Sequence, residues 1–236
     1  MPIPVASVNG DFIWYGDVSE LANGYEALRE LDPYVGFTIA AESRVEIALM
    51  EQLAESLGVE QPHVAFERSP ELEELLRETG WTQEEYERYT LYPQALAVRL
   101  EEAVFSSNFY QTSARHEIEE LRGEVERGVL FSDVAKSDSE HLSASYGGDL
   151  GMLTAGELDP GLESLLDLEI DEVSEILESD TYFAFARVYD QSENEDGEPI
   201  IYVQIVTVNK VGLDEALKNY RDEQNVRMFL PGIVSE

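Results

Sequence analysis

The chain has 236 residues and no cysteine, which excludes disulfides, thiolate nucleophiles and cysteine-ligated metal sites. Its 50 acidic and 15 basic residues leave a formal net charge of −35, so we expect no binding to nucleic acid or to anionic membranes, which requires clustered lysine or arginine. A hydrophobic content of 43% predicts a folded protein of one or two domains. The acidity fits a strongly solvated surface and also fits adaptation to high salt.

The first hundred residues are predicted to be mainly helical. Glycines, prolines and a capping box mark the ends of these segments. The predicted elements are a strand over 5–8 before an Asn-Gly turn, and helices over 13–31, from Ser43 to Leu57, from Pro70 to Gly80, and from Thr82 with an interruption at Pro93.

The pattern changes near Leu96, where strands become as frequent as helices. The predicted elements are strands over 98–105, 173–177, 182–189 and 200–208, and helices over 112–128, 132–136, from Pro160, and over 213–224.

Three segments carry a family resemblance. Phe131-Ser-Asp-Val-Ala-Lys136, Gly147-Gly-Asp-Leu-Gly151 and Glu172-Val-Ser-Glu175 resemble the parvulin prolyl isomerases in order and spacing, over roughly residues 97–190. The flanking segments resemble the helical domain of SurA/PrsA-type folding factors, into which a parvulin domain is inserted.

This resemblance implies an α+β fold, in which a parvulin-like antiparallel sheet with covering helices is inserted into a mainly helical SurA-like domain. The expected parts are an N-terminal helical domain over 1–95, a parvulin-like domain over 96–191, and a strand and helix over 192–236 that return to the helical domain. We therefore expect the two ends of the chain to meet.

The resemblance also locates a degenerate catalytic site. Parvulins carry two histidines, and Glu102 and Ala184 stand at those positions here. The central Cys or Asp of the family falls at Glu140 or His141, and the small hydroxyl residue at Ser179. The resemblance implies an apolar proline pocket made of Leu150, Met152, Leu158 and Leu162.

Prolyl isomerisation needs no nucleophile, because its barrier of ~18–20 kcal/mol comes from amide resonance. An apolar pocket that desolvates the bond could keep some activity without the histidines. Ala184, however, can neither donate nor accept a hydrogen bond through its side chain. The sequence therefore predicts weak or absent isomerase activity.

We expect an extracytoplasmic folding factor that binds unfolded or proline-containing polypeptides and needs no cofactor and no metal. The alternatives are an active isomerase with an altered polar network and a non-catalytic structural or assembly subunit. The three histidines are scattered, and we expect them at the surface. Seven aromatic side chains near the N-terminal helices belong either to the core, which their spacing favours, or to a peptide-binding surface: Trp14, Tyr15, Tyr25, Trp81, Tyr86, Tyr89 and Tyr92.

Overall fold

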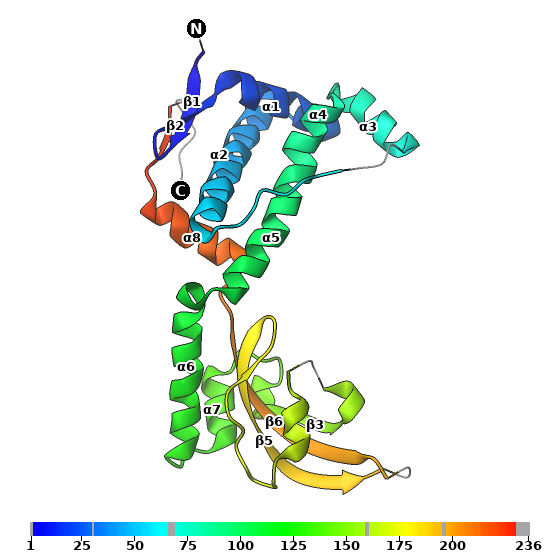
Figure 1. Ribbon diagram of the computed structural model, residues 1–236, viewed down its shortest axis with the longest axis vertical. Helices are drawn as coiled ribbons and strands as arrows, with labels where there is room; N and C mark the ends of the chain where they lie inside the picture. The colour runs from blue at the N-terminus through cyan, green and yellow to red at the C-terminus, as the bar shows by residue number, and fades with distance from the viewer. Residues whose placement is uncertain (1, 30, 66–68, 159–160, 195–196, 230–236) are drawn as a thin grey trace. The chain divides into compact units, whose positions relative to one another are not determined.

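The computed structural model describes residues 2–29, 31–65, 69–158, 161–194 and 197–229. The chain divides into two compact units (Figure 1), a helical unit formed by Met1–Val104 with Leu213–Glu236 and a sheet unit formed by Phe105–Gly212. The helices and antiparallel sheets confirm the predicted α+β class. Within the described ranges, no helix is both long enough and apolar enough to span a membrane.

The helical unit combines a small sheet with a group of helices. Its elements are β1 (Pro4–Val8), β2 (Asp11–Trp14), α1 (Tyr15–Arg29), α2 (Pro33–Leu57), α3 (Pro70–Thr79), α4 (Gln83–Tyr86), the π-helical turn η1 (Glu87–Leu91), α5 (Tyr92–Ser106), α8 (Leu213–Glu223) and β7 (Val226–Met228). α1 packs along α2, and α2 also contacts α8 and β1.

The two ends of the chain meet in this unit. β1 is the central strand of an antiparallel sheet with β2 on one side and β7 on the other, and Ala6 pairs with Met228. The Asn9 side chain donates to Gln224 Oε1 at 2.8 Å. This confirms the prediction that the opening strand and the segment after residue 213 share one core.

Helix α2 begins earlier in the chain than the predicted start at Ser43. It begins at Pro33, and the Asp32 carboxylate accepts from the Tyr34 N–H at 2.9 Å. The expected cap, Ser43, lies inside the helix, so that prediction is wrong. An Asp followed by Pro at the first helical position is the stronger start signal, because the proline lacks the N–H that a first turn leaves unpaired.

Trp81 anchors the core beside α1. Its indole N–H donates to the Glu20 carbonyl at 2.9 Å, and a Cβ on Gly24 would lie 2.0 Å from its ring. Trp81 also contacts the buried Tyr89, with ring centres 6.0 Å apart. Of the seven aromatic residues, Trp81 and Tyr89 are core residues and Trp14 and Tyr15 are exposed. The other three are half-buried: Tyr25, Tyr86 and Tyr92.

The expected strand over 98–105 is wrong, because these residues continue helix α5. The buried side chains are Leu96, Leu100 and Val104, four residues apart, whereas Val98 is exposed. A spacing of four is the period of one helical face, and a strand would bury every second residue.

The sheet unit holds a four-stranded antiparallel sheet in the order β3-β6-β5-β4. Its elements are α6 (Asn108–Glu126), α7 (Phe131–Asp138), β3 (Asp149–Thr154), β4 (Leu177–Glu178), β5 (Tyr182–Glu193), β6 (Pro199–Asn209) and three short 3₁₀ helices, Ala144–Tyr146, Ala155–Glu157 and Glu163–Asp167. The last of these replaces the helix predicted from Pro160, which itself lies outside the described residues. The expected strand over 173–177 is reduced to one bridge at Val173 and to β4.

β6 is a central strand of this sheet. It was expected in the segment that returns to the helical domain, but it lies between β3 and β5, pairing with β5 along its length and with β3 over residues 200–204. β5 and β6 form a long hairpin, and antiparallel strands that follow each other along the chain usually pair. Only the part after Gly212 belongs to the helical unit.

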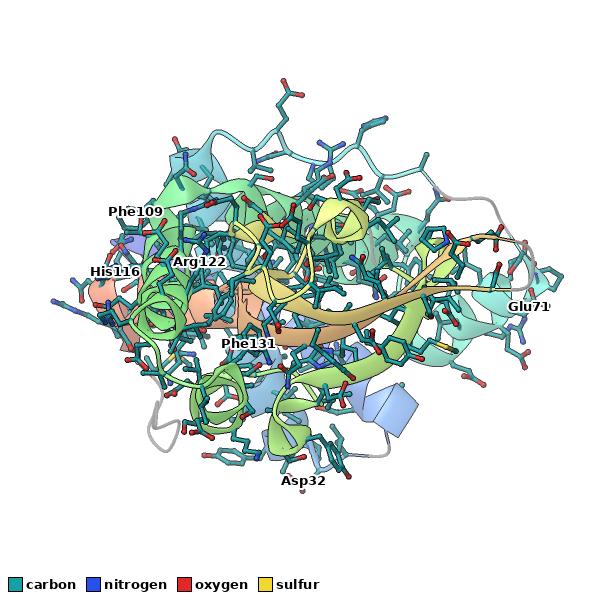
Figure 2. The ribbon with its side chains drawn as sticks, turned by 90° about the horizontal axis from the view of Figure 1, so that it is seen from below. Asp32, Glu71, Phe109, His116, Arg122 and Phe131 are labelled. Atoms are coloured by element: carbon teal, nitrogen blue, oxygen red, sulfur yellow. The ribbon has the colours of Figure 1, made fainter. Side chains whose placement is uncertain are left out.

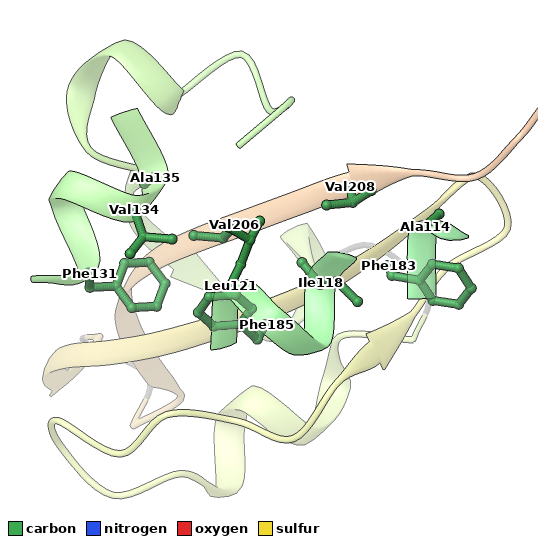
Figure 3. Close-up of a cluster of buried hydrophobic side chains, with 10 residues drawn as sticks. All are labelled: Ala114, Ile118, Leu121, Phe131, Val134, Ala135, Phe183, Phe185, Val206 and Val208. Atoms are coloured by element: carbon green, nitrogen blue, oxygen red, sulfur yellow. The ribbon is translucent and has the colours of Figure 1, made fainter. Parts of the chain in front are cut away.

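The sheet buries both of its faces. On one face, Phe183, Phe185, Val206 and Val208 pack against Ile118 and Leu121 of α6 and against Phe131 and Val134 of α7 (Figure 3). On the other face, Ala184, Ala186, Val203 and Ile205 contact Leu162, Leu165 and Leu177. We call this second face the groove face, because the predicted proline pocket and Ala184 lie on it.

Candidate functional site

Ala184 and Thr207 stand side by side on the groove face. They are directly paired residues of β5 and β6, and such pairs point to the same side of an antiparallel sheet. Ala184 is 0% exposed and Thr207 is 2% exposed. The position that carries a family histidine therefore has a buried threonine hydroxyl, and no imidazole, as its cross-strand neighbour.

The loop after α7 is hydrogen-bonded to β6 on both sides of Thr207. Ser139 Oγ accepts from the Thr207 N–H at 3.1 Å, the Glu140 N–H donates to the Thr207 carbonyl at 3.0 Å, and the Glu140 carboxylate accepts from the Asn209 N–H. The loop then reaches Gly148, where a Cβ would lie 2.3 Å from the Ile205 carbonyl oxygen. The glycine segment is therefore required for this close approach, as expected for a backbone turn leading into a groove.

His141 is held by its own loop. The Ser143 N–H donates to Nδ1 at 3.1 Å and the Ser143 hydroxyl lies 2.9 Å from the same nitrogen. Because Nδ1 accepts a backbone N–H, the neutral ring carries its proton on Nε2. Glu140 and His141, the two candidates for the central position, thus differ in role: Glu140 caps β6, and His141 closes a local turn.

Ser179 is engaged in the turn between β4 and β5. Its hydroxyl oxygen accepts from the Tyr182 N–H at 3.1 Å and from the Thr181 N–H at 3.3 Å, while its own N–H donates to the Tyr182 carbonyl at 3.0 Å. This is the local capping role that serine commonly takes in turns.

Glu178, beside this turn, joins two cations of the sheet unit. Its carboxylate is 2.6 Å from the Arg115 guanidinium and 2.9 Å from the Lys210 ammonium. Partial burial raises the pKa of Glu178, but the hydrogen bonds from Lys210 and Arg115 outweigh it and hold the pKa below its usual value. Both cations also lie over the Phe183 ring, at 5.2 and 4.5 Å from its centre.

Three of the four predicted pocket residues meet on the groove face. Leu162 is buried in the same cluster as Ala184, and Leu150 and Leu158 are half-buried against that cluster. The structure therefore brings three of the four predicted pocket residues into or against one apolar cluster with Ala184.

Met152 points away from this cluster. It pairs with Tyr202, whereas its neighbour Leu153 pairs with Ile201 and packs on the groove face. The register shifts between Asp149 and Gly151, and one extra residue exchanges the faces of all residues that follow. The resemblance placed Met152 in the same pocket as Leu150, and the bulge puts Met152 on the opposite face of the sheet.

Glu102 lies outside the sheet unit. It is an exposed residue of α5 in the helical unit, so it is not on the strand that the sequence analysis expected. The residue that reasoning from sequence missed is Thr207. The sequence did contain a signal for it. The most apolar predicted strand follows β5 after a short acidic turn, and two such strands are expected to pair and to bring their residues side by side.

The histidines do not gather. His116 is exposed on α6 (Figure 2) with its Nε2 3.6 Å from Glu120, and His63 is exposed in the helical unit. Among the described residues, no group of three His, Asp or Glu side chains is placed to hold a metal ion.

Comparisons with known proteins agree with this geometry. Residues 98–190 match the family model described as rotamase, PPIC-type PPIASE domain. Three of the similar curated proteins are named Chaperone SurA. The one from Chromobacterium violaceum is 35% identical over 85 residues, which are 36% of this chain and 19% of the relative. The one from Dechloromonas aromatica is 27% identical over 128 residues, 53% and 29% of the two chains. The one from Thiobacillus denitrificans is 36% identical over 70 residues, 29% and 16% of the two chains.

The chain thus spans less than a third of the length of these relatives. The matched segment contains α6, α7, β3, β4 and most of β5, and it ends before β6 begins. Residues 98–190 thus match the PPIC-type PPIase domain, and the similarity to proteins named Chaperone SurA supports a SurA/parvulin-type family for this segment.

Proposed function

We propose that this protein is an extracytoplasmic folding factor that binds unfolded or proline-containing polypeptides, with weak or no prolyl isomerase activity. The observation that carries the proposal is the pairing of Ala184 with Thr207 beside an apolar cluster. The resemblance to proteins named Chaperone SurA supports both the folding role and the location outside the cytoplasmic membrane.

In this proposal the apolar groove face binds a proline-containing segment. The half-buried Leu150 and Leu158 contact the apolar ring, with the buried Leu162 in the cluster against which they pack, and this apolar setting favours a desolvated amide. Ala184 offers no donor or acceptor, so the network that would stabilise the twisted amide lacks one member. Binding is retained while most of the rate enhancement is lost.

Two assays on the full chain separate this proposal from its alternatives. A protease-coupled assay with proline peptides measures isomerase activity, and suppression of aggregation of an unfolded client measures holding. We expect a rate far below that of an ordinary parvulin together with clear suppression of aggregation. A rate equal to that of an ordinary parvulin would favour the active isomerase, and the absence of both activities would favour the structural subunit.

A matched pair of variants tests the location of the site. Leu150→Thr changes a side chain that packs on the groove face, whereas Met152→Thr, two residues further along β3, changes one that is 54% exposed on the opposite face. We expect Leu150→Thr alone to weaken binding of a proline peptide. Equal losses in the two variants would contradict the assignment of the groove face.

A further inference from the structure

The helical unit contains two adjoining cavities of about 480 and 610 Å³. Both are lined by Arg44 and Glu51 of α2, by Gln61 from the segment after α2, and by Tyr92 at the start of α5. Because these four residues form walls of both cavities, the two are parts of one groove, which we call the Arg44 groove. It lies wholly within the helical unit and is separate from the groove face of the sheet.

Carboxylates dominate the lining of the Arg44 groove. Six of them face it, and they come from β2, α1, α2, α4 and the π-helical turn: Asp11, Asp17, Glu51, Glu55, Glu84 and Glu87. The lining includes two arginines, and one of them, Arg88, is already paired with Glu84 at 3.3 Å. A cleft lined mainly by one sign of charge focuses its field and attracts groups of the opposite charge.

Arg44 is the polar centre of the groove. Its guanidinium carbon lies 5.8 Å from the centre of the Tyr89 ring, and that ring is fixed by a 2.8 Å hydrogen bond from its hydroxyl to Glu20. Arg44 Nε is buried and has no hydrogen-bond partner among the described residues. Because Arg44 lines both cavities, a carbonyl oxygen that enters the groove can accept a hydrogen bond from its guanidinium.

The backbone beside the groove is irregular. Residues Glu87–Leu91 form a π-helical turn directly before Pro93, and this turn brings Glu87, Arg88 and Tyr92 to the groove. Turns of this kind are rare and often occur at functional sites. Burial, followed by the nearby charge of Glu51, raises the pKa of Tyr92 to about 12, so its hydroxyl stays protonated at neutral pH.

Apolar side chains complete the second cavity. Phe12 and Ile13 of β2 and Val59 line it, and Phe12 is 52% exposed. The Phe12 ring lies 5.4 Å from Trp14 and 6.2 Å from Phe229, so exposed aromatic rings continue outward from this end. The groove therefore offers carboxylates, the Arg44 guanidinium and aromatic surface to the same ligand.

We infer that the Arg44 groove is a second polypeptide site, selective for extended client segments that carry lysine or arginine. Arg44 donates to a backbone carbonyl of the segment, the carboxylates bind its cationic side chains, and the aromatic rings contact its apolar residues. This inference rests on the proposed function, because it takes unfolded polypeptides as the ligand, but it assigns them to a different unit and adds a charge preference.

The test uses two labelled peptides of equal length and fluorescence anisotropy with the full chain. One peptide repeats Ala-Tyr-Lys and the other repeats Ala-Tyr-Glu. We expect the lysine peptide to bind at least about tenfold more tightly at low salt, and the difference to shrink as sodium chloride screens the carboxylates. Equal affinities of the two peptides would overturn the inference.

Variants separate the groove from the general attraction of a chain with a net charge of −35. Glu51→Gln with Glu87→Gln should weaken the lysine peptide about fivefold and leave the glutamate peptide unaffected or tighter. The matched control, Glu42→Gln with Glu46→Gln, removes the same charge from exposed positions of α2 outside the groove and should have little effect. Equal losses in the two double variants would show attraction by the whole surface and would refute the groove.

Arg44→Met should weaken the glutamate peptide clearly and the lysine peptide less, because loss of the backbone contact affects both while removal of the cation favours lysine; Arg77→Met on the exposed face of α3 should weaken neither. If Arg44→Met fails to fold, the carboxylate variants still decide. If the wild type suppresses aggregation but does not distinguish the peptides, this inference fails and the proposed function stands. If the wild type binds neither peptide and does not suppress aggregation, both fail.

Discussion

Restoring the two histidines tests whether Thr207, and not Glu102, is the partner of Ala184. We predict that Ala184→His with Thr207→His raises isomerase efficiency above that of either single variant and of the wild type. The two positions are directly paired on neighbouring strands, so two imidazoles there would be close enough to share a hydrogen-bond network. Ala184→His with Glu102→His is the matched control, and it should behave as Ala184→His does alone.

The size of the effect follows from burial at the two positions. Ala184 and Thr207 are 0% and 2% exposed, so each imidazole overpacks the groove face at a cost of about 1–3 kcal/mol. The double variant therefore loses about 2–6 kcal/mol, which is a large part of the 5–15 kcal/mol typical of a folded domain. Urea unfolding must first show that it remains folded at the assay temperature.

The assay is protease-coupled isomerisation of a proline peptide by the wild type, both single variants, the double variant and the control. Neighbouring residues in one network typically couple by 0.5–3 kcal/mol. We expect a coupling of about 1 kcal/mol or more, which corresponds to about a fivefold gain beyond additivity. Additive effects in a folded double variant, or an equal gain in the Glu102 control, would refute the reasoning.

Three further predictions concern stability. Gly24→Ala should destabilise the helical unit by about 1–3 kcal/mol in urea unfolding, because its Cβ would lie 2.0 Å from the Trp81 ring; an unchanged midpoint would mean that the ring can move aside. The pKa of Glu178 is lowered from its usual 4.5 despite partial burial, because Lys210 and Arg115 bind the carboxylate. The ionised carboxylate therefore contributes fully to the free energy of unfolding above pH 4.5, and this contribution is lost as the pH falls through the folded-state pKa. The stability difference between wild type and Glu178→Gln should therefore shrink on acidification, and a difference that grows below pH 4.5 would contradict this. The thermal midpoint should rise when sodium chloride is added at low ionic strength, because the net charge of −35 repels itself, and a flat or falling midpoint would argue against this.

Local signals predicted much of the fold. The short helix predicted over 132–136 is observed as Phe131–Asp138, and the Thr82 capping box and the glycine turn at 147–151 are present as expected, because each depends on residues within a few positions. Two elements were predicted wrongly because two signals competed. Residues 98–105 required a choice between a helical and a strand period, and the start of α2 required a choice between Asp32-Pro33 and Ser43. Leu96, Leu100 and Val104 follow a helical spacing that a strand-like reading of the same residues overlooked.

The site was less predictable, because strand pairing and register decide it. Ala184 was found from the order of motifs, but its neighbour Thr207 follows from the pairing of β5 with β6, which brings a residue 23 positions away to its side. Met152 lies on the opposite face of the sheet from the predicted pocket because β3 contains one extra residue. Neither pairing nor a bulge is encoded by composition or by local periodicity alone.

The position of β6 has a consequence for how the chain is made. β3 enters its sheet by pairing with β6, and β1 is closed on its second side by β7, so each sheet needs a strand from within residues 199–228. A chain that emerges from its N-terminus has an unfinished four-stranded sheet until β6 (Pro199–Asn209) has been made, and an unfinished three-stranded sheet until β7 (Val226–Met228) has been made. Pairings so distant along the chain form slowly, and an incomplete sheet exposes strand edges that aggregate. Until these strands have been made, the protein therefore shares the aggregation hazard of the unfolded chains that we propose it binds.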